Sequence, residues 1–81
     1  MANTRFTGGV SNMWYVTYYG SSYENGLGVL ATFDPEIVEK FLDDRMVIGF
    51  DSTKRSETQD LIVRGYPDDW SFYRVIWEER R

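Results

Sequence analysis

The fold is decided by residues 34–44, which read DPEIVEKFLDD. Asp34 is a good helix N-cap, because its carboxylate accepts hydrogen bonds from the free backbone N–H groups of a first turn. Pro35 suits the first helical position, where its missing N–H costs nothing, and Glu36 complements the positive end of the helix dipole. Apolar side chains then recur at helical spacing, at Ile37, Val38, Phe41 and Leu42. The stretch therefore predicts an amphipathic helix over residues 35–44.

Runs of aromatic and β-branched residues predict strands on both sides of this helix. The expected strands are 13–19, 27–33, 46–50, 61–66 and 72–78. We expect a hairpin loop at 20–26, a polar connection without an apolar anchor at 51–59, and a turn at the Pro-Asp-Asp of 67–69. The resulting order is β-β-α-β-β-β. It predicts an α+β fold, in which a mostly antiparallel sheet of four to five strands carries the one helix on one face.

Length and composition indicate one small domain. The chain has 81 residues, of which 42% are hydrophobic and 17% aromatic, and this apolar content argues against intrinsic disorder. We expect an N-terminal arm at 1–12, where Asn, Thr, Gly and Ser dominate, and a single α+β domain at 13–81. No apolar run approaches the roughly 18–20 residues that span a bilayer, so we expect no membrane partner.

The missing residue types exclude much chemistry. The sequence has no Cys and no His, which rules out disulfides, Cys/His zinc sites, thiol nucleophiles and Ser-His relays. An oxyanion motif is also absent, and so short a chain hardly encloses a substrate cleft. Asp68 and Asp69 precede Trp70, a pattern that a metal or sugar site could use, but turns recruit Asp for its backbone hydrogen bonds. We therefore expect no enzyme, no cofactor and no metal site.

More apolar surface is present than one helix can cover. Strand alternation places one set of residues beneath the helix, at Trp14, Val16, Val29, Ile48, Val63 and Val75. It places a second set on the opposite face, at Tyr15, Tyr19, Leu30, Val47, Ile62, Tyr66, Phe72 and Ile76. Aromatic residues are enriched in the cores of protein interfaces. The candidate partner-binding residues of the second set are therefore Tyr15, Tyr19, Tyr66 and Phe72. The alternative is a sheet that coils on itself, with the N-terminal arm covering the second face.

The exposed side of the predicted helix is acidic. Its carboxylates belong to Glu36, Glu39, Asp43 and Asp44, and only Lys40 relieves them. Acids near the C-terminal end of a helix oppose its dipole, so this ridge suits a basic partner. Glu36, Glu39 and Asp43 are the candidate partner-binding residues on the helix. The alternative is a solvated face without a partner.

Basic residues give little support to nucleic-acid binding. The net charge is −4, whereas a basic stripe is the usual electrostatic footprint of such proteins. The basic residues at 54–55 and 80–81, together with Arg64 and Arg74, would have to converge with exposed Tyr side chains.

The N-terminal part of the chain resembles proteins of tailed phages. Residues 4–12, TRFTGGVSN, are similar to the opening arm of phage head proteins. Four further short segments resemble the first stretch of phage decoration proteins built on β-helices. They are WYV at 14–16, GSS at 20–22, NGL at 25–27 and ATFD at 31–34. The chain departs from that family in being too short for a β-helix, and in having Ser22 where the family's Gly-Ser step carries Asp. The resemblance implies a phage origin and a role in the particle, and it transfers no catalytic residue.

Together these observations predict a non-catalytic protein that binds another protein, viral or host, or a second copy of itself. The first expectation is an accessory protein of a phage particle, found in the virion or in the cytoplasm of the host cell. The alternative is a small acidic inhibitor that binds and blocks a host or defence protein through the helix ridge. A second alternative is a nucleic-acid-binding module.

Overall fold

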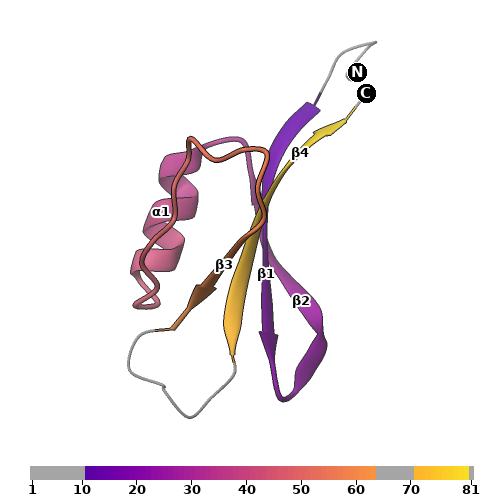
Figure 1. The fold of residues 1–81 in the computed structure, drawn as a ribbon, viewed down its shortest axis with the longest axis vertical. Coiled ribbons are helices and arrows are strands. Elements are labelled where there is room, and N and C mark those ends of the chain that lie inside the picture. Colours follow the sequence, from indigo (N-terminus) through magenta and orange to yellow (C-terminus); the bar gives the residue numbers. More distant parts are fainter. Residues whose placement is uncertain (1–10, 64–70, 81) are drawn as a thin grey trace, which may run out of the picture.

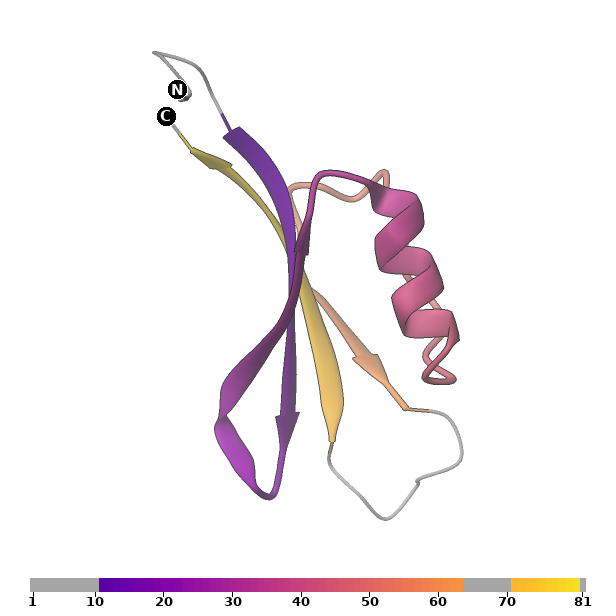
Figure 2. The same cartoon turned by 180° about the vertical axis from the view of Figure 1, so that it is seen from behind.

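Four strands and one helix make up the described part of the chain. The computed structural model describes residues 11–63 and 71–80. The elements are β1 (Ser11–Gly20), β2 (Tyr23–Thr32), α1 (Pro35–Asp43), β3 (Gln59–Ile62) and β4 (Phe72–Arg80). The strands form one antiparallel sheet in the order β2-β1-β4-β3, and α1 lies across one of its faces (Figure 1 and Figure 2). This arrangement confirms the predicted α+β class.

α1 begins as its sequence predicts. Asp34 has an extended backbone, and its carboxylate accepts a hydrogen bond of 2.9 Å from the backbone N–H of Glu36. Val38 and Leu42 are the buried residues of the helix. The helix ends at Asp43, one residue before the predicted end. The local N-cap and the apolar stripe are therefore enough to place this element.

β1 and β4 are the two central strands of the sheet, because each pairs with two neighbours. The register between β1 and β4 puts three cross-strand pairs on the helix side: Trp14 with Trp77, Val16 with Val75, and Tyr18 with Tyr73. The alternate pairs lie on the opposite side: Tyr15 with Ile76, Thr17 with Arg74, and Tyr19 with Phe72. The two faces of β1 are those that strand alternation predicts.

The core lies between the sheet and α1. Its buried residues are Trp14, Val16, Val38, Leu42, Val47 and Val75. Trp14 is the largest of them and is only 1% exposed. Its ring makes edge contacts with Phe50 and Trp77, at centroid distances of 5.1 and 4.8 Å. Since a buried aromatic ring removes roughly 150–250 Å² from water, Trp14 is the main anchor of this small core.

The strand predicted at 46–50 is wrong. Only Val47 pairs, in an isolated antiparallel bridge. Met46 has a φ of 60°, in the left-handed region, and turns the chain as it leaves α1. The backbone N–H of Val47 then donates to the carbonyl of Leu42 over 2.9 Å, which ties the segment to the helix. Val47, predicted for the far face, is consequently buried at 2% exposure, whereas Ile48, predicted for the core, is 55% exposed.

The first hairpin is tighter than predicted. β1 ends at Gly20 and β2 begins at Tyr23, so a turn at residues 21–22 replaces the loop expected at 20–26. The register is irregular just beyond this turn, and the residues that were expected in the loop belong to the flared end of the hairpin (Figure 1).

A β-bulge in β2 interrupts the alternation. Val16 pairs with Leu30 while Thr17, the next residue, pairs with Gly28, so Val29 is an extra residue on the β2 side. A bulge turns consecutive side chains toward the same face. Val29 and Leu30 both pack against the core for this reason. The prediction that Leu30 lies on the opposite face is therefore wrong.

β3 begins before its predicted start and organises the connection that precedes it. Gln59 is buried, and its side-chain oxygen accepts from the backbone N–H of Asp51 over 2.9 Å. Its side-chain nitrogen donates to the carbonyls of Asp51 and Lys54, at 2.9 and 3.4 Å. The connection thus has a polar anchor in place of an apolar one.

Several predictions lie outside the described residues. These are the arm at 1–10, the end of the predicted strand at 64–66, which includes Tyr66, and the turn at 67–69. Ser11 and Asn12, expected in the arm, belong to β1.

Candidate functional site

One face of the sheet points away from α1. The helix and the connection that follows it lie on the same side (Figure 1 and Figure 2), and within residues 11–63 and 71–80 no helix or loop covers the other side. The side chains on this uncovered side come from β1, β3 and β4: Met13, Tyr15, Thr17, Tyr19, Asp60, Ile62, Phe72, Arg74, Ile76 and Glu78. We call this set the aromatic face.

Tyr19 and Phe72 lie at the end of the aromatic face that is nearest the turn between β1 and β2. They are cross-strand partners on β1 and β4, and their rings stack with a centroid distance of 4.9 Å and an interplanar angle of 10°. Aromatic pairs of this kind contribute about 0.5–1.5 kcal/mol beyond the area that they bury. The stack therefore holds both rings in a defined position on the surface.

The backbone of β2 packs closely against the ring of Tyr19 at Gly26. The φ of Gly26 is 91°, and a Cβ built on this residue would lie 2.8 Å from Tyr19 Cε2 and 2.8 Å from Thr17 Cγ2. Real Cβ atoms do not approach other atoms so closely. Only glycine meets both requirements, since it adopts positive φ freely and lets the backbone approach the ring.

Arg74 joins the aromatic stack to β3. Its Nε donates to Asp60 Oδ1 over 2.7 Å and its Nη2 donates to Asp60 Oδ2 over 3.0 Å, a two-point contact across the β3–β4 pair. The guanidinium carbon lies 5.1 Å from the centroid of Tyr19 and 5.5 Å from that of Phe72, within the range of cation–π attraction. The hydrogen bonds from Arg74 lower the pKa of Asp60, and those to Asp60 raise the pKa of Arg74. The positive charge on this face is thus already paired.

The end of the aromatic face toward the start of β1 is apolar except for Glu78. Tyr15 and Ile76 are cross-strand partners there, and both are half-buried. Ile62, at the β3 edge beside Phe72, is 67% exposed. The face therefore combines partly accessible rings and aliphatic side chains with one ion pair and, at one end, the carboxylate of Glu78. Such a surface suits contact with an apolar protein surface, because Tyr and Arg are the residue types that most often dominate binding energy.

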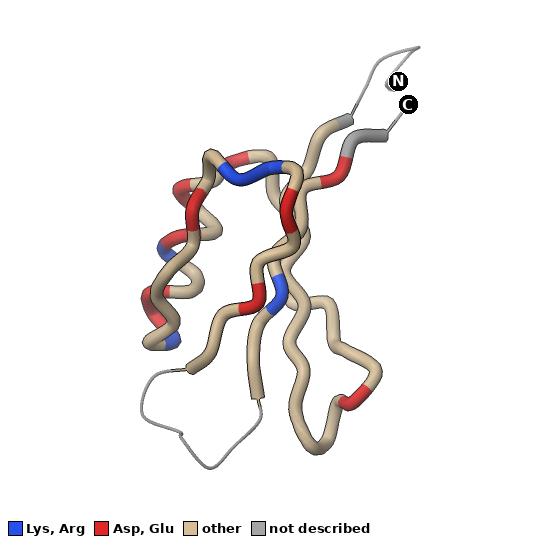
Figure 3. The backbone as a smooth tube through the Cα atoms, in the orientation of Figure 1, with Lys and Arg blue, Asp and Glu red and all other residues tan. Residues whose placement is uncertain are grey.

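The acidic candidates lie on the other layer of the molecule. Glu36, Glu39 and Asp43 are exposed on α1, and Figure 3 shows that red, acidic segments recur along the helix. No salt bridge is formed between them and any basic side chain in the described ranges, although Lys40 lies among them. The sheet separates this ridge from the aromatic face, so the structure forms two distinct surfaces from the predicted residues.

The structure brings together three of the four aromatic candidates. Tyr15, Tyr19 and Phe72 share the aromatic face, and Tyr66 lies outside the described residues. Sequence reasoning missed the roles of Arg74 and Gly26. The Asn-Gly pair at 25–26 signals a turn but not its packing on a ring, and the Arg74 contact depends on the β3–β4 register.

Other classes of site find no support within the described ranges. In residues 11–63 and 71–80, no group of three or more Asp, Glu, His or Cys side chains is arranged to hold a metal ion. The described residues also include no helix with the length and hydropathy needed to cross a membrane. No protein-family model matches the chain, and no curated protein or solved structure matches it significantly.

Proposed function

We propose that this chain is a non-catalytic protein-binding domain whose contact surface is the aromatic face. One observation carries the proposal: an ordered stack of rings, braced by Arg74 and Gly26, lies on the side of the sheet that no described element covers. Ordering side chains before binding reduces the entropy lost on association. The arrangement therefore favours recognition of a partner.

The partner that we favour is a neighbouring subunit of a phage particle. The similarity of residues 4–12 to the arms of phage head proteins supports this choice. On this proposal the chain is an accessory protein, and the occupant of the aromatic face is an apolar patch of that subunit. The pairing of Arg74 with Asp60 neutralises the two charges beside the aromatic stack, which suits an apolar contact there better than a charged one.

Nucleic acid fits the aromatic face less well. A phosphate backbone needs unpaired Lys or Arg side chains beside the rings. Among the described basic side chains, Arg74 alone lies on this face, and its charge is paired with Asp60. Arg45 and Arg55 are stacked on rings of Phe41 and Trp77 instead. Figure 3 shows the blue segments of the tube scattered among red ones rather than gathered.

A second candidate function uses the helix ridge. Three carboxylates of α1, the carboxylate of its C-cap residue and one lysine line an open depression: Glu36, Glu39, Asp43, Asp44 and Lys40. That surface would suit a small acidic inhibitor that blocks a basic surface of a host or defence protein. Binding through it would be salt-sensitive, because exposed charges are screened over about 10 Å at 0.1 M salt.

Site-specific photocross-linking separates the two surfaces. A benzoylphenylalanine at position 15 probes the aromatic face and one at position 36 probes the ridge, both in the full chain within the lysate of the cells that make it. We expect a single adduct of defined mass from position 15, and its loss when Ile62 is replaced by Lys. Ile62 is exposed at a sheet edge, so this change has little effect on folding.

A matched control keeps the result specific. Ile37→Lys makes the same substitution at an exposed apolar residue of α1, 48% exposed, and is expected to leave the position-15 adduct intact. Adducts from position 36 alone would overturn the proposal and favour the acidic inhibitor. Adducts that copurify with nucleic acid and vanish on nuclease treatment would favour the nucleic-acid module.

A further inference from the structure

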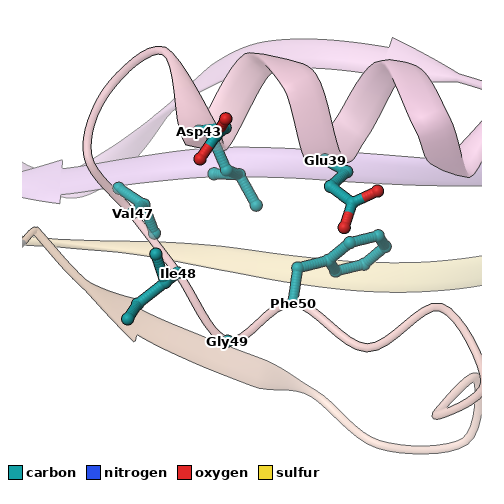
Figure 4. Close-up of a pocket in the computed structure, with 7 residues that line it drawn as sticks. Glu39, Asp43, Val47, Ile48, Gly49 and Phe50 are labelled. Carbon is teal, nitrogen blue, oxygen red and sulfur yellow. The ribbon is translucent and has the colours of Figure 1, made fainter.

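A small groove lies between α1 and the segment that follows it. Its lining residues are Glu39, Leu42, Asp43, Val47, Ile48, Gly49 and Phe50, and its volume is about 110 Å³. Figure 4 shows the helix above it and the chain at 47–50 below it, with Glu39 reaching down toward the ring of Phe50. Drug-sized ligands occupy roughly 300–1,000 Å³, so this groove holds about one amino-acid side chain.

The walls of the groove are fixed in place. The backbone N–H of Val47 donates to the carbonyl of Leu42 over 2.9 Å, which joins the lower wall to the helix. The ring of Phe50 is held edge-on against Trp14, at a centroid distance of 5.1 Å. Gly49 has a φ of 105°, a backbone conformation that glycine adopts freely, so the chain can turn there. A groove that exists before binding loses little entropy when it is occupied.

The chemistry of the groove is apolar inside and acidic at the rim. Leu42 and Val47 are buried within it, whereas Glu39 and Asp43 are exposed on the helix above. These two carboxylates are four residues apart, a spacing at which like charges repel on a helix. Asp43 also lies in the last turn, where a negative charge opposes the helix dipole. None of the described residues that line the groove is basic, so a cation placed there would relieve both effects.

We infer that this groove takes the side chain of a lysine or arginine from a partner protein. Such a side chain has an apolar stem and a cationic head, and it buries the stem while the head stays at the polar rim. The stem would lie along Leu42, Val47 and Ile48. The head would meet the carboxylates of Glu39 and Asp43, near the face of Phe50, where an aromatic ring attracts a cation. The inference concerns the helix layer and does not depend on the aromatic face.

Titration of the full chain with a blocked amino acid tests this inference. The probe is Nα-acetyl-lysine amide, with Nα-acetyl-arginine amide as a second arm, and the readout is the backbone amide spectrum of the isotope-labelled protein. Nα-acetyl-norleucine amide is the matched control, because it keeps the four-carbon stem and lacks the charge. We expect saturable shifts over a millimolar range at Glu39, Asp43 and 48–50 with the lysine or arginine probe. The norleucine probe should produce shifts there that are at least severalfold weaker.

Isosteric variants assign the effect to the rim. Glu39→Gln and Asp43→Asn should each raise the dissociation constant about threefold, the scale of one exposed ion pair. Glu36→Gln removes a carboxylate from the same helix but outside the groove, so it should leave the constant unchanged. Ile48→Ala, which removes an exposed wall without opening the core, should also weaken binding.

Three other outcomes of these titrations would overturn the inference. An absence of shifts, or equal binding of the norleucine probe, would show that the groove does not select a basic side chain. An equal loss in Glu36→Gln and Glu39→Gln would indicate a diffuse acidic field and no site. Ile62→Lys, which disrupts the aromatic face, should leave lysine binding unchanged, so failure here and failure of the proposed function remain distinguishable.

Discussion

Replacing Gly26 with Ala tests how the aromatic face is built. The new methyl group would lie 2.8 Å from Tyr19 Cε2, 2.8 Å from Thr17 Cγ2 and 2.9 Å from Tyr19 Cζ. The φ of 91° at this position also disfavours any residue with a side chain. The substitution therefore combines backbone strain with a steric conflict against the ring that stacks on Phe72.

The expected loss of stability follows from these two effects. A residue other than glycine in a positive-φ region costs about 1–2 kcal/mol. Pushing two side chains aside to admit a methyl group costs about 1–3 kcal/mol. Since the ring of Tyr19 is partly exposed and can shift, we expect a total near 2–4 kcal/mol. A chain of this length has roughly 4–12 kcal/mol to lose, so the effect is large.

Gly28→Ala is the internal control for this prediction. Gly28 lies two residues away in the same strand, with no other atom within 4 Å of its Cβ position and no positive φ. Alanine there restricts the unfolded chain, so the free energy of unfolding should change by no more than about 0.5 kcal/mol. Urea unfolding followed by the fluorescence of the three tryptophans, among them the buried Trp14, measures both variants. Equal losses in the two variants would refute the packing of β2 onto Tyr19.

Three further predictions concern the parts that support the two surfaces. Gln59→Ala removes the polar anchor of the connection and should cost about 1–3 kcal/mol, with faster amide hydrogen exchange across 51–58; unchanged protection there would contradict it. Asp34→Ala removes the helix N-cap and should lower the unfolding free energy by about 1 kcal/mol in urea, and a value within error of the parent chain would contradict the cap. Arg74→Gln removes the partner that lowers the pKa of Asp60 in the folded state. The parent chain should therefore be more stable than the variant by a full, constant amount at pH values above the ordinary Asp pKa of about 3.9. This difference in unfolding free energy should disappear as the pH falls through the lower pKa that Asp60 has in the folded parent. The pair is exposed, so the difference between the parent and this variant should stay below about 1 kcal/mol, and a difference that does not change with pH would disprove the linkage.

The elements that the sequence predicts well are those whose signals are local. The N-cap, the proline and the apolar stripe of 34–44 act within the helix itself, and α1 begins and ends within one residue of the prediction. β1 is also predictable, because aromatic and β-branched residues fill it without interruption from Trp14 to Tyr19. The aromatic candidates Tyr15 and Tyr19 were correctly placed on one face for the same reason.

The errors arise where one residue interrupts the regular alternation of side chains between the two faces of the sheet. Met46 adopts a positive φ after the helix, which moves Val47 into the core and Ile48 out of it. Val29 adds an extra residue to β2, which directs Leu30 toward the helix side. A pattern of apolar residues at alternate positions does not reveal such a residue, because each is selected by packing between elements that are distant in the sequence.

These two corrections reduce the number of apolar residues on the side of the sheet opposite α1. Val47 and Leu30 move from the predicted far face to the core, so part of the apolar surplus is used to stabilise the domain. What remains opposite the helix is dominated by rings and by Arg74, which are ordered by contacts with one another rather than by burial. A domain this thin gains little from holding a surface residue such as Arg74 in a two-point contact, since exposed ion pairs contribute at most about 1 kcal/mol. The order of the aromatic face therefore supports the proposal that it presents one shape to a partner.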